Sequence, residues 1–351
     1  MPKKIFIGLN NIANVGLSLK SGFKEIGISA DFYSADKTMH KYDYPKNSHT
    51  QVNRLISSEN IVLRYFQLIF LMLKLILRYD YFIFLQGSTL LSNFKDVKLL
   101  RKLGKKVSVI FAGCDVRVPE IVSKYKWNPC RDCPESYQNF VGCKFPGKYK
   151  KLEELKKNFE IIFSPDECAG YFEEKYHTYY FPVNDIDFST LEGPNNTSKK
   201  EVIRIIHAPT NEDYKGSKHI YKAIELLRNK YKFEYLSVQN LSKEELVQEI
   251  LKCDLVIDQL IGGFYGILAV EAMLLQKPVV CYIRDDIWNK IEEDCPIYNA
   301  NPDNLEKILE EILTNPEPLI ERGKKSRHYA LEYHSPKRIA ENMLEIFNEV
   351  R

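Results

Sequence analysis

The sequence predicts an α/β protein of two doubly wound domains, each with a mainly parallel β-sheet between layers of helices. The chain has 351 residues, about twice the usual length of a single domain. Short β-branched or aromatic runs alternate with longer segments of 3.6-residue period from one end of the chain to the other. With 44% hydrophobic and 28% charged residues, the composition is that of a folded soluble protein.

Strands are expected where short apolar runs are bounded by turn residues. In the first half these runs are residues 4–9, 28–33, 81–85, 106–111 and 160–163, and in the second half 202–207, 233–238, 255–258 and 278–283. Helical patterns separate them, and residues 190–200 combine turn formers and charges without an apolar period. We therefore expect a first domain at 1–188, a linker at 189–200, a second domain at 201–334 and a C-terminal helix at 335–351 that packs back toward the first domain.

Charge and hydropathy exclude several classes of protein. Fifty Lys and Arg against 47 Asp and Glu give a net charge of +3, too small a surplus to indicate nucleic acid as a partner. The apolar run near the N-terminus is too short for a signal peptide, and charged residues interrupt the most apolar stretch, residues 61–85. We expect a cytoplasmic protein. A nicotinamide-dependent dehydrogenase is disfavoured, because residues 9–16 supply only one glycine of the Gly-x-Gly-x-x-Gly pattern.

A glycine-rich turn follows the expected strand at 255–258. Gly262, Gly263 and Gly266 keep side chains out of the way, so backbone N–H groups at the start of the next helix can face an anion such as a diphosphate. Glu271 lies on the order of 9 Å along that helix, where its carboxylate could accept hydrogen bonds from the hydroxyls of a ribose. The alternative is a tight strand-to-helix turn with a solvated glutamate.

A lysine stands at a second loop of the same domain. Lys215 and Gly216 follow the expected strand at 202–207 and precede an amphipathic helix, so the ammonium group could neutralise phosphate oxygens. By itself, such a lysine is usually a solvated loop charge. Because both signals fall at the carboxyl ends of strands in one domain, together they predict a site for a nucleotide diphosphate.

These segments resemble the C-terminal domain of GT-B glycosyltransferases, in particular the bacterial family 4 enzymes that build surface polysaccharides. The motifs that carry the resemblance are residues 207–211, 215–216, 258–273, 277–284 and 323–334, and residues 11–27, 79–91 and 102–117 resemble the acceptor-side domain. The resemblance implies a GT-B fold, in which two Rossmann-like domains face each other across a cleft. It also implies transfer of a sugar from a UDP- or GDP-sugar to a glycan or lipid-linked acceptor.

Residue roles follow from the resemblance position by position. Lys215 would bind the donor diphosphate and Glu271 the ribose, both taking part in catalysis. Other donor-side residues are Asn211, Gly216, Gly263, Phe264, Tyr265, Gly266 and Arg284, and those on the acceptor side are Asn14, Gly16, Asp115 and Arg117. The chain departs from the family pattern where Gly263 replaces the first glutamate of a pair and Ala112 replaces a histidine. The alternative function is therefore a degenerate GT-B protein that binds a nucleotide-sugar or a partner without turnover.

The expected chemistry needs stabilisation of a departing diphosphate beside an oxocarbenium-like sugar. Lys215 and the helix that follows Gly266 could provide it without a catalytic metal, with Arg284 or Asn211 replacing the family's missing arginine. We expect retention of configuration, for which no protein base is evident. If the enzyme inverts, Asp115 is the best candidate for the base, and its alternative role is a cap on the following helix.

Four cysteines fall within 30 residues in a segment rich in turn formers. Cys130 and Cys133 form a Cys-x-x-Cys pair, which together with Cys114 and Cys143 predicts a structural zinc site that holds a loop-like insertion at about 125–149. A redox pair or simply buried thiols are the alternatives.

A long helical pattern at 61–77 is apolar over most of its circumference. Together with the basic residues Lys144, Lys148, Lys150 and Lys151, it has the composition of a peripheral membrane contact, useful for reaching a lipid-linked acceptor. The alternative is a core helix of the first domain.

Overall fold

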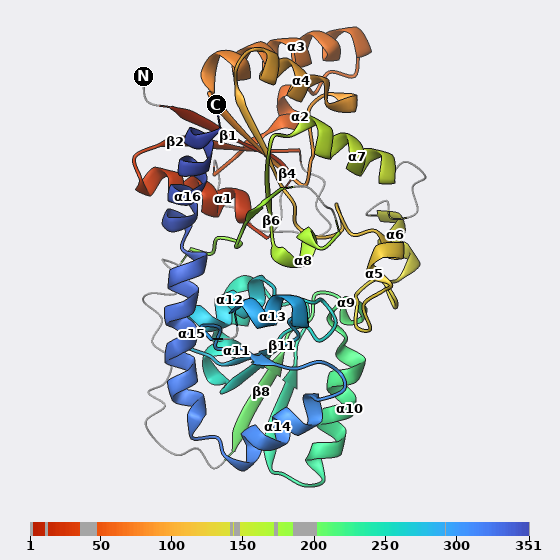
Figure 1. Ribbon diagram of the computed structural model, residues 1–351, viewed down its shortest axis with the longest axis vertical. Helices are drawn as coiled ribbons and strands as arrows, with labels where there is room; N and C mark the ends of the chain where they lie inside the picture. Colours follow the sequence, from red (N-terminus) through yellow and green to blue (C-terminus); the bar gives the residue numbers. More distant parts are fainter. Residues whose placement is uncertain are drawn as a thin grey trace. The chain divides into compact units, whose positions relative to one another are not determined.

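The computed structural model describes residues 3–10, 13–35, 48–140, 143, 148–171, 175–184, 202–291 and 293–350. The chain folds into two compact units (Figure 1). Unit 1 comprises Met1–Val118, Val141–Pro182 and Ser335–Arg351, and unit 2 comprises Pro119–Phe140 and Val183–His334. The division differs from the expected boundaries at two segments: residues 119–140 and 183–188, both expected within the first domain, belong to unit 2.

Unit 1 is built on a parallel sheet of seven strands in the order β3-β2-β1-β4-β5-β6-β7. The strands are β1 Lys4–Leu9, β2 Ser29–Ser34, β3 Thr50–Gln51, β4 Tyr81–Leu85, β5 Lys106–Ile110, β6 Ile161–Ser164 and β7 His177–Thr178. The connecting helices are α1 Val15–Glu25, α2 Val52–Leu55, α3 Ile61–Arg78, the 3-10 turn η1 Ser92–Phe94, α4 Lys95–Lys102, α7 Lys148–Asn158 and α8 Asp166–Ala169. Strands β1, β4 and β5 are buried almost throughout, as their apolar sequences predict.

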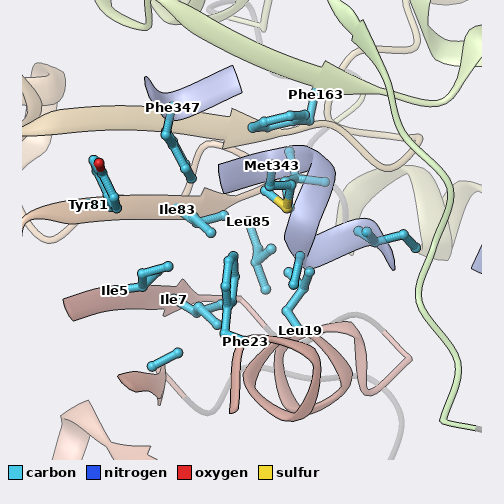
Figure 2. Close-up of a cluster of buried hydrophobic side chains, with 14 of the residues drawn as sticks. Ile5, Ile7, Leu19, Phe23, Tyr81, Ile83, Leu85, Phe163, Met343 and Phe347 are labelled. Atoms are coloured by element: carbon cyan, nitrogen blue, oxygen red, sulfur yellow. The ribbon is translucent and has the colours of Figure 1, made fainter. Parts of the chain in front are cut away.

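One face of this sheet is covered by α1 and by the last helix of the chain, α16 Pro336–Glu349 (Figure 2). Met343 and Phe347 of α16 lie among side chains of β1, β4 and α1, and the Phe347 ring stacks on Tyr81 at 4.8 Å between centroids. Gly22 allows α1 to approach closely, because a Cβ at this position would lie 2.0 Å from the carbonyl oxygen of Pro336. The C-terminal helix is therefore part of the core of unit 1.

The other face of the sheet carries an aromatic cluster. Phe6 lies 5.0 to 5.9 Å from the rings of Tyr33, Tyr79, Phe82 and Phe84. Helix α3 contributes only Leu71, Met72 and Leu75 to the buried residues. The alternative that this helix is buried in the core is therefore wrong, since most of its apolar side chains are exposed to solvent.

Unit 2 contains a parallel sheet of five strands in the order β12-β11-β10-β8-β9. The strands are β8 Ile203–His207, β9 Phe233–Ser237, β10 Leu255–Ile257, β11 Val279–Cys281 and β12 Tyr298–Asn299. The helices are α5 Pro119–Val122, α6 Glu135–Phe140, α9 Glu212–Lys215, α10 Ser217–Arg228, α11 Lys243–Lys252, α12 Ile267–Leu274, α13 Asp285–Ile291, α14 Leu305–Thr314 and α15 Pro318–His334. The prediction of two doubly wound domains is confirmed, and every expected strand is found within two residues of its predicted bounds.

Residues 119–140 join unit 2 through contacts made with its helices and loops. The ammonium groups of Lys126 and Lys218 pair with Asp303 and Asp132 at 2.5 and 2.6 Å. The Trp127 ring packs beside the core of unit 2, and its indole N–H donates to Asp303 at 3.2 Å. These partners are distant in sequence, which explains why a sequence pattern placed the segment in the first domain. Among the described residues, no helix is long and apolar enough to span a membrane.

Candidate functional site

The glycine turn and the loop lysine meet on one carboxylate in unit 2. Asp258 follows β10 and Lys215 ends α9, which begins in the loop after the neighbouring strand β8. The Lys215 ammonium donates to Asp258 Oδ1 at 2.5 Å, and the Gly266 amide donates to Oδ2 at 2.8 Å. Asp258 is 0% exposed and Lys215 is 8% exposed, so the ion pair is largely shielded from water. Of the predicted donor-side residues, the structure thus brings Lys215 and Gly266 together at Asp258.

This arrangement changes the role that the sequence suggested for Gly266. Its N–H group is occupied by Asp258, and the Ala269 and Val270 amides donate to the Gly266 carbonyl at 3.1 and 3.4 Å. The N–H groups left for an anion at this helix start are therefore those of Ile267 and Leu268. A Cβ at Gly266 would lie 3.3 Å from both Asp258 Oδ2 and Lys215 Nζ, tighter than ordinary van der Waals contact. Glycine here therefore lets the start of the helix approach the ion pair.

Gln259 and two glycines shape the turn between β10 and α12. The Gln259 side chain donates to the Phe264 carbonyl, and its amide nitrogen would lie 2.5 Å from a Cβ at Gly262. Gly263 has φ +84°, and its carbonyl accepts the Arg284 N–H at 3.0 Å. The turn is also joined to the lysine loop, because the Leu260 amide donates to the Lys215 carbonyl at 2.9 Å. Gly216, with φ +74°, ends α9 directly after Lys215.

Phe264 and Tyr265 lie in the interior rather than on a donor-binding surface. They are 9% and 4% exposed, and their rings stack at 4.2 Å. The Tyr265 hydroxyl lies 3.0 Å from His334 Nε2 and 3.2 Å from the Tyr329 hydroxyl, both on α15. Their side chains therefore fix α12 against α15, and the donor contacts predicted for them would have to come from their backbone.

Glu271 and Arg284 both have partners within unit 2. The Glu271 carboxylate, half-buried on α12, lies 3.9 Å from the Lys243 ammonium. The Arg284 guanidinium makes two hydrogen bonds to Asp286, at 2.7 and 2.9 Å, and its carbon lies 4.2 Å from the centre of the Tyr125 ring. A donor phosphate would compete with Asp286 for this guanidinium.

Two polar residues, one at the end of β8 and one in the loop after it, serve the local fold. The Asn211 side chain accepts the Tyr214 amide at 2.9 Å and so caps α9. His207 is fully buried, with Nδ1 2.9 Å from the Ile257 carbonyl and Nε2 2.7 Å from the Ser217 hydroxyl. Burial lowers the pKa of His207 to about 4, so the ring is neutral near pH 7. It ties β8 to β10 and α10 beneath the lysine loop.

In unit 1, the loop after β5 holds Asp115 in an unusual environment. Its carboxylate accepts the Ala112 amide, with both oxygens at 3.2 Å. Burial raises the pKa of Asp115 to about 6, although this amide bond acts in the opposite direction. The side chain closes its own loop, and near pH 7 it is ionised and able to accept a proton.

Arg117 lies inside unit 1 rather than at an acceptor surface. It is 6% exposed, and its guanidinium pairs with Glu167 of α8 through two bonds of 3.0 and 2.9 Å. Although burial acts to raise it, the adjacent Arg117 holds the pKa of Glu167 below its ordinary value. Gly113, with φ +139°, is needed beside this pair, since a Cβ there would lie 2.9 Å from the guanidinium.

The predicted acceptor residues Asn14 and Gly16 stand at the start of α1. A Cβ at Gly16 would overlap the Phe32 ring at 2.5 Å, so the glycine serves the packing of α1 on β2. Asn14 has φ +64°, and its side-chain oxygen is buried without a hydrogen-bond partner in the part of the chain described. Sequence reasoning missed Asn10 and Gln86, whose side chains meet at 2.5 Å after β1 and β4; the signal was their position directly after buried strands.

The cysteines predicted to bind zinc are divided between the two units. Cys114 and Cys143 belong to unit 1 and Cys130 and Cys133 to unit 2, all four half-buried. Within the described ranges, no group of three or more His, Cys, Asp or Glu side chains is placed to hold a metal ion. The zinc hypothesis therefore has no support from the structure. The other four cysteines are buried, as expected of core residues.

The two parallel α/β units define the GT-B fold of glycosyltransferases, which solved structures share over almost the whole chain. An α-glucosyltransferase in complex with UDP is 12% identical in sequence and has a TM-score of 0.64, and the match covers 99% of this chain and 100% of the α-glucosyltransferase chain. Sucrose-phosphate synthase from Thermosynechococcus elongatus is 10% identical, with a TM-score of 0.58, and the match covers 100% of this chain and 99% of the synthase chain. Anabaena HepE in complex with UDP and glucose is 10% identical, with 100% of both chains covered and a TM-score of 0.55.

No protein-family model matches the sequence, and no curated protein matches it either. At these sequence identities the likeness shows the fold. The GT-B expectation is thereby confirmed, and the activity is argued from the site.

Proposed function

We propose that this protein is a glycosyltransferase that takes a sugar from a UDP- or GDP-sugar held by unit 2. The main observation that supports this proposal is that Lys215 and the start of α12 meet at Asp258, at the carboxyl ends of β8 and β10. Open α/β sheets bind ligands at this edge, and a cation beside a helix N-terminus suits a diphosphate. Solved GT-B structures with UDP bound support the same choice of ligand.

The donor would be held by groups spaced along α12. The diphosphate would accept hydrogen bonds from Lys215 and from the amides of Ile267 and Leu268 at the start of the helix. Glu271 lies five residues after Gly266, roughly 7.5 Å along the axis at about 1.5 Å per residue. That spacing suits a carboxylate that accepts hydrogen bonds from ribose hydroxyls. These hydroxyls would replace the Lys243 ammonium, which lies 3.9 Å away, as the polar partner of Glu271.

Catalysis in this proposal is stabilisation of the leaving diphosphate. As the bond between the sugar and the diphosphate breaks, negative charge gathers on the phosphate oxygens, where the Lys215 ammonium and the α12 dipole lower its energy. Asp258 holds the ammonium in place before the donor binds. These groups supply the required positive charge, so we propose a reaction without a catalytic metal.

The acceptor would be a glycan or a lipid-linked precursor of a bacterial surface polysaccharide, in a cytoplasmic reaction that retains configuration. If the reaction inverts instead, Asp115 is the proposed base, since a carboxyl with a pKa of about 6 is ionised at pH 7 and can take the acceptor's proton. The polar residues Asn10 and Gln86 follow the adjacent strands of unit 1 and add to the proposed acceptor side.

Calorimetry with UDP and GDP tests the donor site. The double variant Lys215→Met/Asp258→Asn removes both buried charges together, so neither remains unpaired. We expect it to weaken nucleotide binding by about 1.5 to 3 kcal/mol, the contribution of charge-assisted hydrogen bonds. The control is Lys222→Ala, an exposed lysine on α10 of the same unit. Equal affinities of the double variant and the control would refute the site.

The alternative function is nucleotide-sugar binding without turnover. It is favoured by Gly263, which stands where the resembled family has a glutamate and whose carbonyl is engaged by the Arg284 amide. Release of UDP or GDP from a panel of nucleotide-sugars separates the two functions, because even slow donor hydrolysis demonstrates a working transfer site. Binding without release, also in the presence of extracts that contain acceptors, would favour the alternative.

A further inference from the structure

Helix α3 of unit 1 turns an apolar surface toward solvent. Nine of its side chains are large, apolar and exposed: Ile61, Val62, Leu63, Tyr65, Phe66, Ile69, Phe70, Leu73 and Leu77. The exposed fraction reaches 71% for Phe70 and 87% for Leu77. A helix at the surface of a water-soluble domain normally has charged residues on this face, so the pattern is inverted.

The charges of α3 itself are all positive, and the surrounding segment is mainly basic, although Asp31 pairs with Arg78 at 2.8 Å. Helix α3 contains Arg64, Lys74 and Arg78 and no acidic residue. Residues 53–106 contain ten Lys and Arg against three Asp and Glu, a surplus of seven, whereas the whole chain has a surplus of three. One of the three acids, Asp96, is buried and accepts the amides of Leu90 and Leu91.

The topology brings more of these cations to the same side of unit 1. The connections from β3 to β4 and from β4 to β5 run in the same direction across the parallel sheet. Right-handed crossovers therefore place α3 and α4 on one face, and Figure 1 shows both helices in that part of unit 1. Helix α4 adds the exposed Lys95, Lys98 and Lys102 and two exposed leucines, Leu99 and Leu103, the latter just after its end.

We propose that α3 docks on an anionic lipid bilayer, with its axis in the membrane plane and its exposed apolar face in the headgroup region. A helix of 18 residues is roughly 27 Å long at about 1.5 Å per residue, and a face with Phe66 and Phe70 at its centre matches this mode of binding. The surrounding Lys and Arg would contact lipid phosphates. A second copy on this face would oppose two surfaces of the same charge, which disfavours a dimer.

Flotation with lipid vesicles tests this inference on the full chain. Vesicles of phosphatidylcholine with about 30 mol% phosphatidylglycerol should bind the protein, and pure phosphatidylcholine should bind it at least about tenfold more weakly. The variant Phe66→Ser/Phe70→Ser should lower partitioning by at least about tenfold. Neutralising Lys74 and Lys102 to Gln should lower it by about fivefold for each charge.

The matched control is Leu226→Ser/Ile320→Ser, which removes two exposed apolar side chains from helices of unit 2 and should bind as the wild type does. No vesicle binding, or equal binding by the Phe66→Ser/Phe70→Ser variant, would overturn the inference. A dimer that this variant dissociates would overturn it in favour of a contact between copies. Binding of this chain to an acidic protein, without binding to vesicles, would overturn the inference too.

This inference stands apart from the proposed transfer reaction. Vesicle binding is measured without nucleotide, and nucleotide affinity is measured by calorimetry without vesicles. We expect Phe66→Ser/Phe70→Ser to bind UDP or GDP as the wild type does, because both residues lie on α3 of unit 1. Loss of lipid binding with intact nucleotide binding, or the reverse, therefore identifies which of the two ideas fails.

Discussion

Replacing Asp258 by asparagine should destabilise unit 2 strongly. The Lys215 ammonium and the Gly266 amide both donate to this carboxylate, at 2.5 and 2.8 Å, and an amide side chain can accept from only one of them while its NH₂ group faces the other. Removing one partner of a buried ion pair costs about 3 to 5 kcal/mol. For a unit of this size each kcal/mol lowers Tm by about 2 to 4 °C, so we expect a decrease of roughly 6 to 20 °C.

The pair between Asp132 and Lys218 provides a matched control in the same unit. It has nearly the same distance, 2.6 Å, but its side chains are 37% and 60% exposed. Since exposed pairs contribute about 1 kcal/mol or less, Asp132→Asn should change Tm by no more than a few degrees. Calorimetric melting of both variants makes the comparison. If the Asp258→Asn and Asp132→Asn variants had the same Tm, burial would not be the source of the strength of the Lys215–Asp258 pair, and the reasoning would fail.

Two further predictions concern the donor and acceptor sides. Glu271→Ala should weaken nucleotide affinity by about 1.5 to 3 kcal/mol through lost hydrogen bonds to the ribose, and calorimetry showing unchanged affinity would remove this role. The pKa of Asp115 is raised to about 6, so the folded state binds this proton more tightly than the unfolded chain does. Stability should therefore fall as pH rises from about 4 to 6, and Asp115→Asn should flatten that part of the curve in urea unfolding. An unchanged slope in Asp115→Asn would assign the titration to another group.

Much of the fold could be predicted because secondary structure leaves a local pattern. Each buried strand of the two sheets is a short apolar run, and its length and flanking turns set its position within two residues. The glycine turn and Lys215 could be linked because parallel strands end at the same edge of a sheet. Asp258 was predicted as the last residue of a buried strand, but its hydrogen bonds to Lys215 and Gly266 could not be predicted.

The predicted side-chain roles were less dependable where a residue has an alternative partner. Arg117, Tyr265 and Arg284 have the chemistry expected of site residues. In the structure they engage Glu167, His334 and Asp286, which lie from two to 69 positions away. A polar side chain near a loop has the same sequence signature whether it faces a ligand or a neighbouring element.

The sequence by itself determined the alternation of strands and helices, the two sheets and the edge at which Lys215 and Gly266 would lie, since these depend on periodicity and turn chemistry. Tertiary structure alone decided that residues 119–140 belong to unit 2 and that the apolar face of α3 remains in contact with water. The physical reason is that burial depends on which distant segments cover a surface. An apolar helix has the same sequence pattern whether its face is buried in protein or left exposed.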